Sequence, residues 1–174
     1  MSDTERRQSN LKLNFVRQQG FDDVQPQSCS LQFSALLFQP RIVGLWCVTG
    51  IVLQSSAAFL ALGATLCWCV LFPQWNPFEL LYNSTFGSRA GALKLGSAPA
   101  PRRFAQGMAG AFSLAIGILL MVQQRIAAYV LEAMFLLAIA ALIFGGFCLG
   151  SFIFHLITGR IAFARRTLPW SPGT

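Results

Sequence analysis

The chain has 174 residues, of which 55% are hydrophobic and only 11% charged, and its formal net charge is +7. Because soluble domains carry about 25% charged residues, this composition excludes an ordinary soluble domain and predicts an integral membrane protein. The basic residues flank apolar runs instead of forming a patch interleaved with stacking side chains, which argues against a nucleic-acid-binding protein.

Residues 1–39 form a polar segment ahead of the long apolar runs. The first thirty residues are mixed in charge and lack the apolar stretch that a cleavable secretion signal needs. We therefore expect a polar or interfacial N-terminal arm. Residues 159–174 are basic, and we expect them to form a tail after the last apolar run.

The run 42–72 contains no charged residue and admits two interpretations. One tilted helix needs about 20 residues to cross the hydrocarbon core, and two helices of about 15 residues would each fall short of its thickness of about 30 Å. Gln54 and the serines after it interrupt the run near its middle. Length alone leaves a single long span and a hairpin both open.

The distribution of basic residues favours the hairpin. With four spans at about 40–54, 56–72, 104–122 and 126–158, twelve of the thirteen Lys and Arg residues fall on one side and only Arg125 falls on the other. With three spans, the two sides would carry six and seven. Because basic residues accumulate on the cytoplasmic side, we predict an all-α integral membrane four-helix bundle over residues 40–158, with the arm and the tail in the cytoplasm.

Small residues recur every four positions along the later spans. Helices in lipid associate where small side chains let their backbones approach, so these residues predict the helix-contact surfaces. The predicted contact residues are Ala57 and Ala61 in the second span, Ala109, Ser113 and Gly117 in the third, and Gly146 and Gly150 in the fourth.

Several polar residues lie within or beside the spans. Arg125 and Glu132 share a face of the fourth span near its outer end, and we expect an interfacial ion pair there. Gln54 and Gln106 lie near helix ends, where they are expected to cap a helix or to form hydrogen bonds between helices.

His155 is the only histidine in the chain. It could ligate a haem iron or the magnesium of a chlorophyll-type pigment, and Ser151, one turn earlier, would leave room for a macrocycle. A haem with two histidine ligands would need a second histidine, so a hydrogen-bonding residue at the interface is the favoured interpretation. No metal or other cofactor is predicted, because no ligand-type residues have zinc-like spacing and no catalytic set is present.

Three short motifs carry a family resemblance: Pro40-Arg41, Arg103-Phe104-Ala105-Gln106, and Gly146-Phe147-Cys148-Leu149-Gly150. With these motifs, residues 40–158 resemble an uncharacterised family of small bacterial inner-membrane proteins, a domain of unknown function. The resemblance implies a four-span protein of the bacterial inner membrane with no established activity. The family carries a Cys-x-x-Cys at the end of its fourth span, and Ser151 occupies the second cysteine position here. Because disulfide exchange needs both sulfurs, this replacement argues against disulfide catalysis at Cys148.

These observations favour a non-catalytic accessory subunit of a larger membrane complex, such as a photosynthetic or respiratory assembly. Its partners would be other membrane subunits and lipids, contacted through the spans and the polar arm, with no nucleic acid and no soluble substrate. One alternative is a small thiol or quinone redox protein centred on Cys148, in which Cys148 or His155 contacts the redox group. The other alternative is a small transporter.

Overall fold

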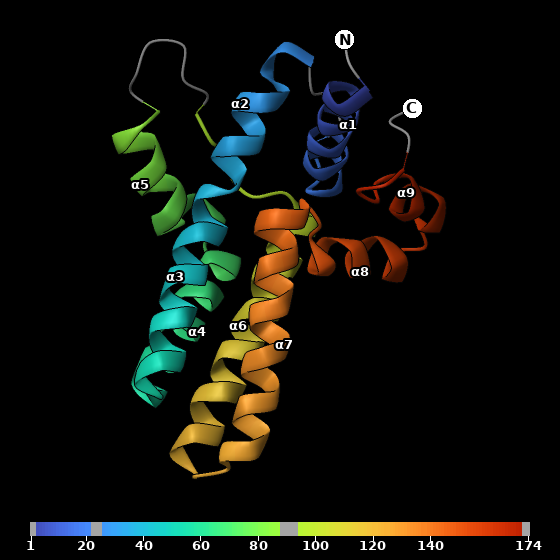
Figure 1. The fold of residues 1–174 in the computed structure, drawn as a ribbon. Coiled ribbons are helices and arrows are strands. Elements are labelled where there is room, and N and C mark those ends of the chain that lie inside the picture. The colour runs from blue at the N-terminus through green and yellow to red at the C-terminus, as the bar shows by residue number, and fades with distance from the viewer. Residues whose placement is uncertain (1–2, 22–25, 88–93, 172–174) are drawn as a thin grey trace.

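The computed structural model describes residues 3–21, 26–87 and 94–171, and its regular secondary structure there is helical throughout. Four helices stand side by side as a bundle: α3 (Phe38–Leu53), α4 (Ser56–Leu71), α6 (Ala100–Met121) and α7 (Arg125–Gly145) (Figure 1). The other helices gather at one end of this bundle: α1 (Asp3–Gln18), α2 (Pro26–Leu36), α5 (Pro77–Thr85), α8 (Leu149–Ile157) and α9 (Ile161–Arg166). We call this end of the bundle, where these five helices lie, the polar end.

The bundle has the length and apolar character of a membrane domain. Three of the described segments, Cys29–Leu53, Ala100–Met121 and Arg125–Gly145, are long and apolar enough to cross a bilayer. Helix α4 is equally apolar but shorter, and its 16 residues rise about 24 Å. The protein is therefore an all-α membrane helical bundle, as its composition predicts.

The run 42–72 folds as a hairpin of two helices that separate at Gln54 (Figure 1). Gln54 adopts the left-handed conformation (φ 43°) and ends α3 as its C-cap. The hydroxyl of Ser55 accepts a hydrogen bond from the Ala58 backbone N–H (3.2 Å) and so caps α4. The indole of Trp46 donates to the Ala58 carbonyl (3.1 Å), which fastens α3 to the start of α4.

The connection from α4 to α6 begins with a short turn and continues through helix α5. The 3-10 turn η1 (Pro73–Trp75) follows the end of α4. The side chain of Asn76 accepts a hydrogen bond from the Phe78 backbone N–H (3.0 Å), which caps α5. This local chemistry sets α5 beside the polar end and positions Glu79 in its first turn.

The prediction that the fourth span continues to residue 158 is wrong. Helix α7 ends at Gly145, and Gly146 caps it in the left-handed conformation with φ 60°. The chain then turns, and α8 runs across the bundle axis (Figure 1). Helix α8 buries Ser151 and His155 on one face and exposes residues such as Ile157 on the other, which is typical of a helix lying at a membrane interface.

The boundary predicted between the polar arm and the first span is also wrong. The apolar helical segment starts at Cys29, well before residue 40, because α2 leads through Leu37 into α3 without leaving the helical conformation. Pro40 does not interrupt it, since a proline is tolerated in the first turn of a helix. Helix α1 folds back onto the polar end, where Asn14 donates to the carbonyls of Leu168 (3.1 Å) and Ser171 (3.2 Å).

The helix contacts follow the predicted small residues in part. Gly117 and Ser113 lie at the interfaces of α6, and Gly117 approaches Leu60 of α4 so closely that a Cβ there would lie 2.8 Å from the Leu60 Cγ. Ala109 packs at the edge of the main core.

Three of the other predicted contact residues need correction. Ala57 and Ala61 are exposed, because α4 turns a different stripe inward. That stripe is Phe59, Leu62, Gly63, Leu66 and Cys69. Gly146 does contact another helix, since it lies against Leu11 of α1, but it does so from the cap of α7 and not from a stripe within a span.

Candidate functional site

The predicted ion pair between Arg125 and Glu132 does not form. The guanidinium of Arg125 instead contacts Gln123 Oε1 (3.2 Å from Nη2), at the exposed turn between α6 and α7. Glu132 is buried, and its carboxylate accepts from Gln54 Nε2 at 3.2 and 3.3 Å. The two positions are seven residues apart, which separates them by about 10 Å along the helix. The hairpin end therefore supplies the partner of Glu132, and Gln54 acts both as a cap and as a bond between helices.

His155 lies inside the protein and not at an open interface. It is 1% exposed, its Nε2 lies 3.1 Å from the carbonyl oxygen of Gln18, and the Phe163 ring packs edge-on against it at 4.7 Å. Helices α1, α8 and α9 enclose this ring, and the Gln18 carbonyl oxygen is the protein partner of its Nε2. Within the described residues, no group of three or more metal-ligating side chains occurs.

Cys148 and Ser151 are held by backbone contacts at the turn between α7 and α8. Gln18 Oε1 accepts a hydrogen bond from the Cys148 backbone N–H (2.9 Å), and the Ser151 hydroxyl donates to the Pro101 carbonyl (3.3 Å). Cys148 is 4% exposed and its thiol is free. Gln18 thus joins the N-terminal helix to both Cys148 and His155, a role that its position in a polar arm does not indicate.

A second buried polar cluster lies beside this turn, and we call it the Arg102 network: Gln39, Glu79, Arg102 and Gln106. Arg102 Nη2 lies 3.7 Å from Glu79 Oε1. Gln39 Oε1 accepts from both Arg102 Nη2 (3.1 Å) and Gln106 Nε2 (2.8 Å). Burial raises the pKa of Glu79 above its ordinary value of 4.5, and the nearby Arg102 offsets only part of that effect.

The Arg102 network retains unused hydrogen-bonding capacity. Arg102 and Gln106 are 5% and 6% exposed, yet Arg102 Nη1 and Gln106 Oε1 have no hydrogen-bond partner in the described part of the chain. Burying a polar atom without a partner costs about 1–3 kcal/mol. Glu79 Oε1 also has no hydrogen-bond partner there, so the network holds one unmatched donor and two unmatched acceptors. Arg102 and Gln106 are neighbours in the network, because both side chains are bonded to the same Gln39 oxygen.

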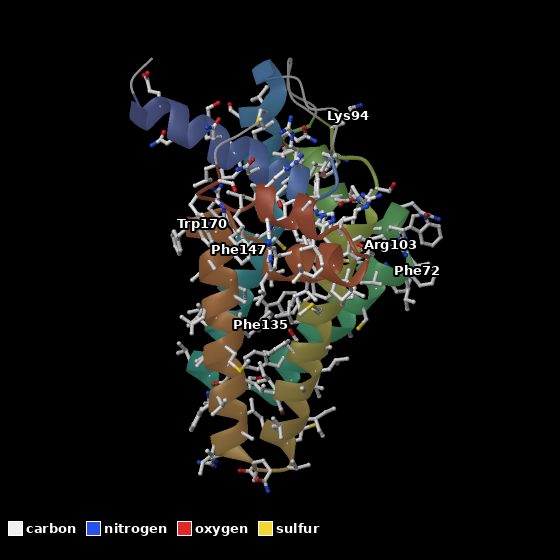
Figure 2. The ribbon with its side chains drawn as sticks, turned by 90° about the vertical axis from the view of Figure 1, so that its right-hand side faces the viewer. Phe72, Lys94, Arg103, Phe135, Phe147 and Trp170 are labelled. Atoms are coloured by element: carbon white, nitrogen blue, oxygen red, sulfur yellow. The ribbon has the colours of Figure 1, made fainter. Side chains whose placement is uncertain are left out.

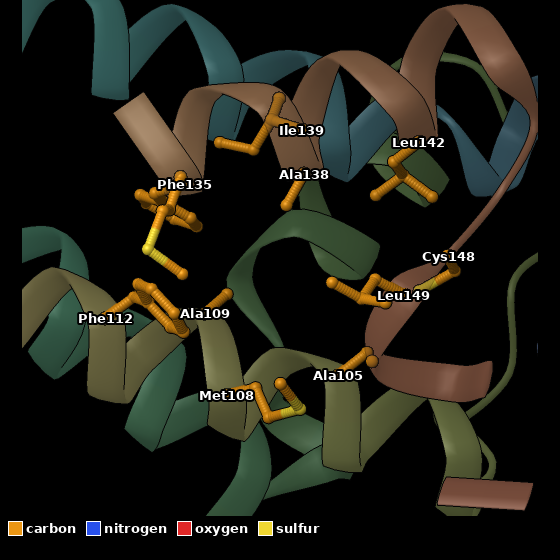
Figure 3. Close-up of a pocket in the computed structure, with 12 residues that line it drawn as sticks. Ala105, Met108, Ala109, Phe112, Phe135, Ala138, Ile139, Leu142, Cys148 and Leu149 are labelled. Carbon is orange, nitrogen blue, oxygen red and sulfur yellow. The ribbon is translucent and has the colours of Figure 1, made fainter. Parts of the chain in front are cut away.

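Two cavities adjoin the network. The first, about 130 Å³, lies between α6 and α7 and has an almost wholly apolar lining that includes Met108, Phe112 and Ala138 (Figure 3). The second, about 80 Å³, reaches Gln39, Arg102 and Gln106. Both cavities share the same wall residues: Ala105, Ala109, Phe135, Ile139, Leu142 and Cys148. In Figure 2, Phe135 lies within the bundle, whereas Trp170 lies at its periphery near the polar end.

A hollow of about 310 Å³ lies on the outer side of the bundle between α3 and α7, and we call it the α3–α7 groove. Its lining is apolar apart from Arg41 at one end, with small residues Gly44 and Ala140 between large ones. Phe144 is 86% exposed and forms one edge. The groove has the shape that small residues create where helices pack in a membrane.

The candidate site was only partly predictable. Arg102 and Gln106 are four residues apart, so they share a helix face, and this spacing is the one signal in the sequence that pointed to the network. Glu79 and Gln39 come from other elements, and no local pattern brings them together. The two candidate redox or ligand residues lie at opposite ends of α8, Cys148 before its first turn and His155 in its last, and each is bonded to Gln18.

The comparison with protein families finds a match. Residues 34–158 match the family described as Domain of unknown function (DUF4395). This range includes the four bundle helices, α8 and all four residues of the Arg102 network, and leaves out α1 and α9. Searches of curated proteins and of solved structures find no match.

Proposed function

Because this chain belongs to the family of unknown function DUF4395, we propose its function from its geometry: it is a non-catalytic accessory subunit of a larger complex in a bacterial inner membrane. The α3–α7 groove carries the proposal. We propose that a helix of another subunit occupies it, with Phe144 packed against that helix and the small residues Gly44 and Ala140 allowing close approach.

The position of α7 in the bundle supports a partner on this side. Only 22% of the most apolar stretch of α7 is buried within the chain, compared with 33% for α6 and 39% for the segment that contains α3. Helix α7 is thus the most hydrophobic and the least enclosed of the long helices. Association between helices in lipid depends on close packing, and a groove provides more contact than a smooth helix face.

We propose that the polar end faces the cytoplasm. Arg125, in the turn at the opposite end, is the exception among thirteen basic residues in the four-span assignment. Helix α1 and the segment that follows α9 lie together at the polar end, because Asn14 is bonded to Leu168 and Ser171. A reporter fused after residue 174 should therefore report a cytoplasmic location.

The thiol redox alternative has less support. Its only sulfur at the α7–α8 turn, Cys148, is 4% exposed, and the neighbouring Ser151 hydroxyl is engaged with Pro101. Disulfide exchange requires an accessible thiolate and a second thiol. The transporter alternative has no observation of its own in the described residues.

Isolation of the protein from its native membrane in a mild detergent tests the subunit proposal. We expect it to migrate on a native gel as part of a larger complex. Ala140→Phe fills the α3–α7 groove and should release the protein from the complex. Ala141→Phe is the matched control, because Ala141 is exposed on the same helix and does not line the groove.

Two results would count against the proposal. The first is wild-type protein that migrates alone under conditions in which other membrane complexes stay intact. The second is an Ala140→Phe variant that stays in the complex as well as Ala141→Phe does. The unfolding temperature of both variants, measured in detergent, separates loss of association from loss of folding.

A further inference from the structure

The two cavities beside the Arg102 network combine a polar end and an apolar end. They share six wall residues and therefore lie side by side. The second cavity reaches the buried amides and guanidinium, and the first, drawn in Figure 3, lies between α6 and α7. We propose that the two cavities together form a binding site for a neutral lipid that carries a hydroxyl group on an apolar body.

The polar compartment selects the head group. Arg102 Nη1 can donate one hydrogen bond and Gln106 Oε1 can accept one, and neither has a partner among the described residues. A single hydroxyl group satisfies both, because its oxygen accepts from the guanidinium while its O–H donates to the amide oxygen. A hydrocarbon would leave both atoms unpaired, and a carbonyl oxygen would leave Gln106 unpaired.

The charge balance favours a neutral head group. Arg102 is the cation of the network, and Glu79 lies 3.7 Å away with its side chain 7% exposed. The ionised pair has no net charge to offer an incoming anion, so a fatty acid carboxylate would be brought into a buried site with no free counter-ion. Burial of an unpaired charge is costly, which disfavours that ligand.

The apolar compartment accepts the part of the lipid body that lies next to the head group. Its volume of about 130 Å³ is close to that of an engineered apolar cavity of about 150 Å³ that stays dry and binds benzene. Small residues create the space, including Ala109 on α6 and Ala138 on α7. Met108 and Met134 border it, and flexible methionine side chains adapt to ligands of varied shape. Because the chamber lies between two bundle helices, a lipid can enter it directly from the membrane.

Photolabelling tests this site with a defined probe. Hexadecanol carrying a diazirine in its chain is irradiated with the full-length protein in lipid nanodiscs, and the labelled peptides are identified by mass spectrometry. We expect labels on the stretches of α6 and α7 that line the first cavity. Unlabelled hexadecanol should compete roughly tenfold better than hexadecane or palmitate, because only the alcohol forms both hydrogen bonds without adding charge.

Two variants separate the compartments. Ala138→Leu fills the apolar chamber and should lower labelling severalfold, whereas Ala133→Leu, an exposed position on the same helix, should leave labelling unchanged. Gln106→Met keeps the chamber and removes the acceptor, so labelling should persist while the preference for alcohol over alkane disappears. Circular dichroism of each variant confirms that the protein is folded.

Three outcomes would overturn the proposal. Equal competition by alcohol, alkane and carboxylate would indicate ordinary lipid contact. Labelling unchanged by Ala138→Leu would place the probe elsewhere. A preference for alcohol that persists in Gln106→Met would show that the Arg102 network does not bind the head group.

A separate experiment identifies the natural lipid that carries the hydroxyl group. Lipids are extracted from protein isolated in nanodiscs from its native membrane and compared with those of the Ala138→Leu variant. Enrichment of diacylglycerols, prenyl alcohols or isoprenoid quinols in the wild type names the source. Equal profiles for the two proteins would contradict the site. This test does not depend on a partner subunit, so the lipid site and the accessory role can fail independently.

Discussion

Gly150 allows α8 to lie directly on α6, and replacing it with alanine should separate the two helices. A Cβ at residue 150 would lie 2.7 Å from both the Cα and the Cβ of Ala105, whereas ordinary contacts are 3.4–4 Å. Because one of the two atoms belongs to the backbone, no side-chain rotation relieves the contact. Helix α8 must move, which also strains the hydrogen bond from Ser151 to the Pro101 carbonyl.

The expected cost of Gly150→Ala is about 1–3 kcal/mol of unfolding free energy, as for other overpacked interiors. We would measure it by titrating detergent-solubilised protein with SDS and following tryptophan fluorescence. Gly145→Ala is the matched control, since Gly145 is helical and a Cβ there meets nothing within 4 Å. That variant should lose no stability.

A double variant separates the two close contacts at Ala105. Ala105→Gly removes one of the two close atoms but leaves the Ala105 Cα at 2.7 Å, so it should restore only part of the stability lost by Gly150→Ala. A Gly150→Ala variant as stable as the wild type, or a Gly145→Ala variant that loses as much stability, would contradict a steric role for Gly150. Full recovery in the double variant would show that the backbone contact has no role.

Two further predictions concern buried polar groups. Burial raises the pKa of Glu79 above 4.5, so the folded state holds the proton more tightly than the unfolded state, and the carboxyl favours folding most below pH 4.5. That contribution is lost as the pH rises through the raised pKa. The unfolding free energy of the wild type, measured between about pH 4 and 7, should therefore decline more than that of Glu79→Gln. Parallel curves for the two proteins would contradict this role of Glu79. Gln18→Leu leaves the Cys148 N–H without its partner and should cost about 1–3 kcal/mol, with faster maleimide labelling of Cys148; an unchanged labelling rate would argue against docking of α1 through Gln18.

Local patterns predicted those parts of the fold in which neighbouring residues act on one another. The polar interruption at Gln54 and Ser55 marks the hairpin because both residues cap helices, and caps are local chemistry. The end of α7 was missed although Gly145 and Gly146 mark it. Apolar residues continue on both sides of the glycines, so hydropathy alone cannot distinguish one long helix from two that meet at an angle.

The predictions of polar contacts failed for a different reason, since the partners are distant in the sequence. Glu132 was assigned to Arg125 because both lie on one helix face, yet its partner Gln54 is 78 residues away and comes from the hairpin end. The partners of Gln18 are also distant in the sequence. In the sequence it belongs to a polar arm, but it bonds residues 130 and 137 positions later.

Composition, charge distribution and caps, read from the sequence by itself, determined that this protein is an α-helical membrane bundle with the run 42–72 favoured as a hairpin. These properties depend on the solvent around each segment and on residues a few positions apart, so they can be inferred without knowledge of the fold. Only the tertiary structure decided that α8 crosses the bundle and that Arg102, Gln39, Glu79 and Gln106 meet beside two cavities. The physical reason is that a buried polar group takes its partner from whichever element packs against it, and that element is set by packing and not by sequence proximity.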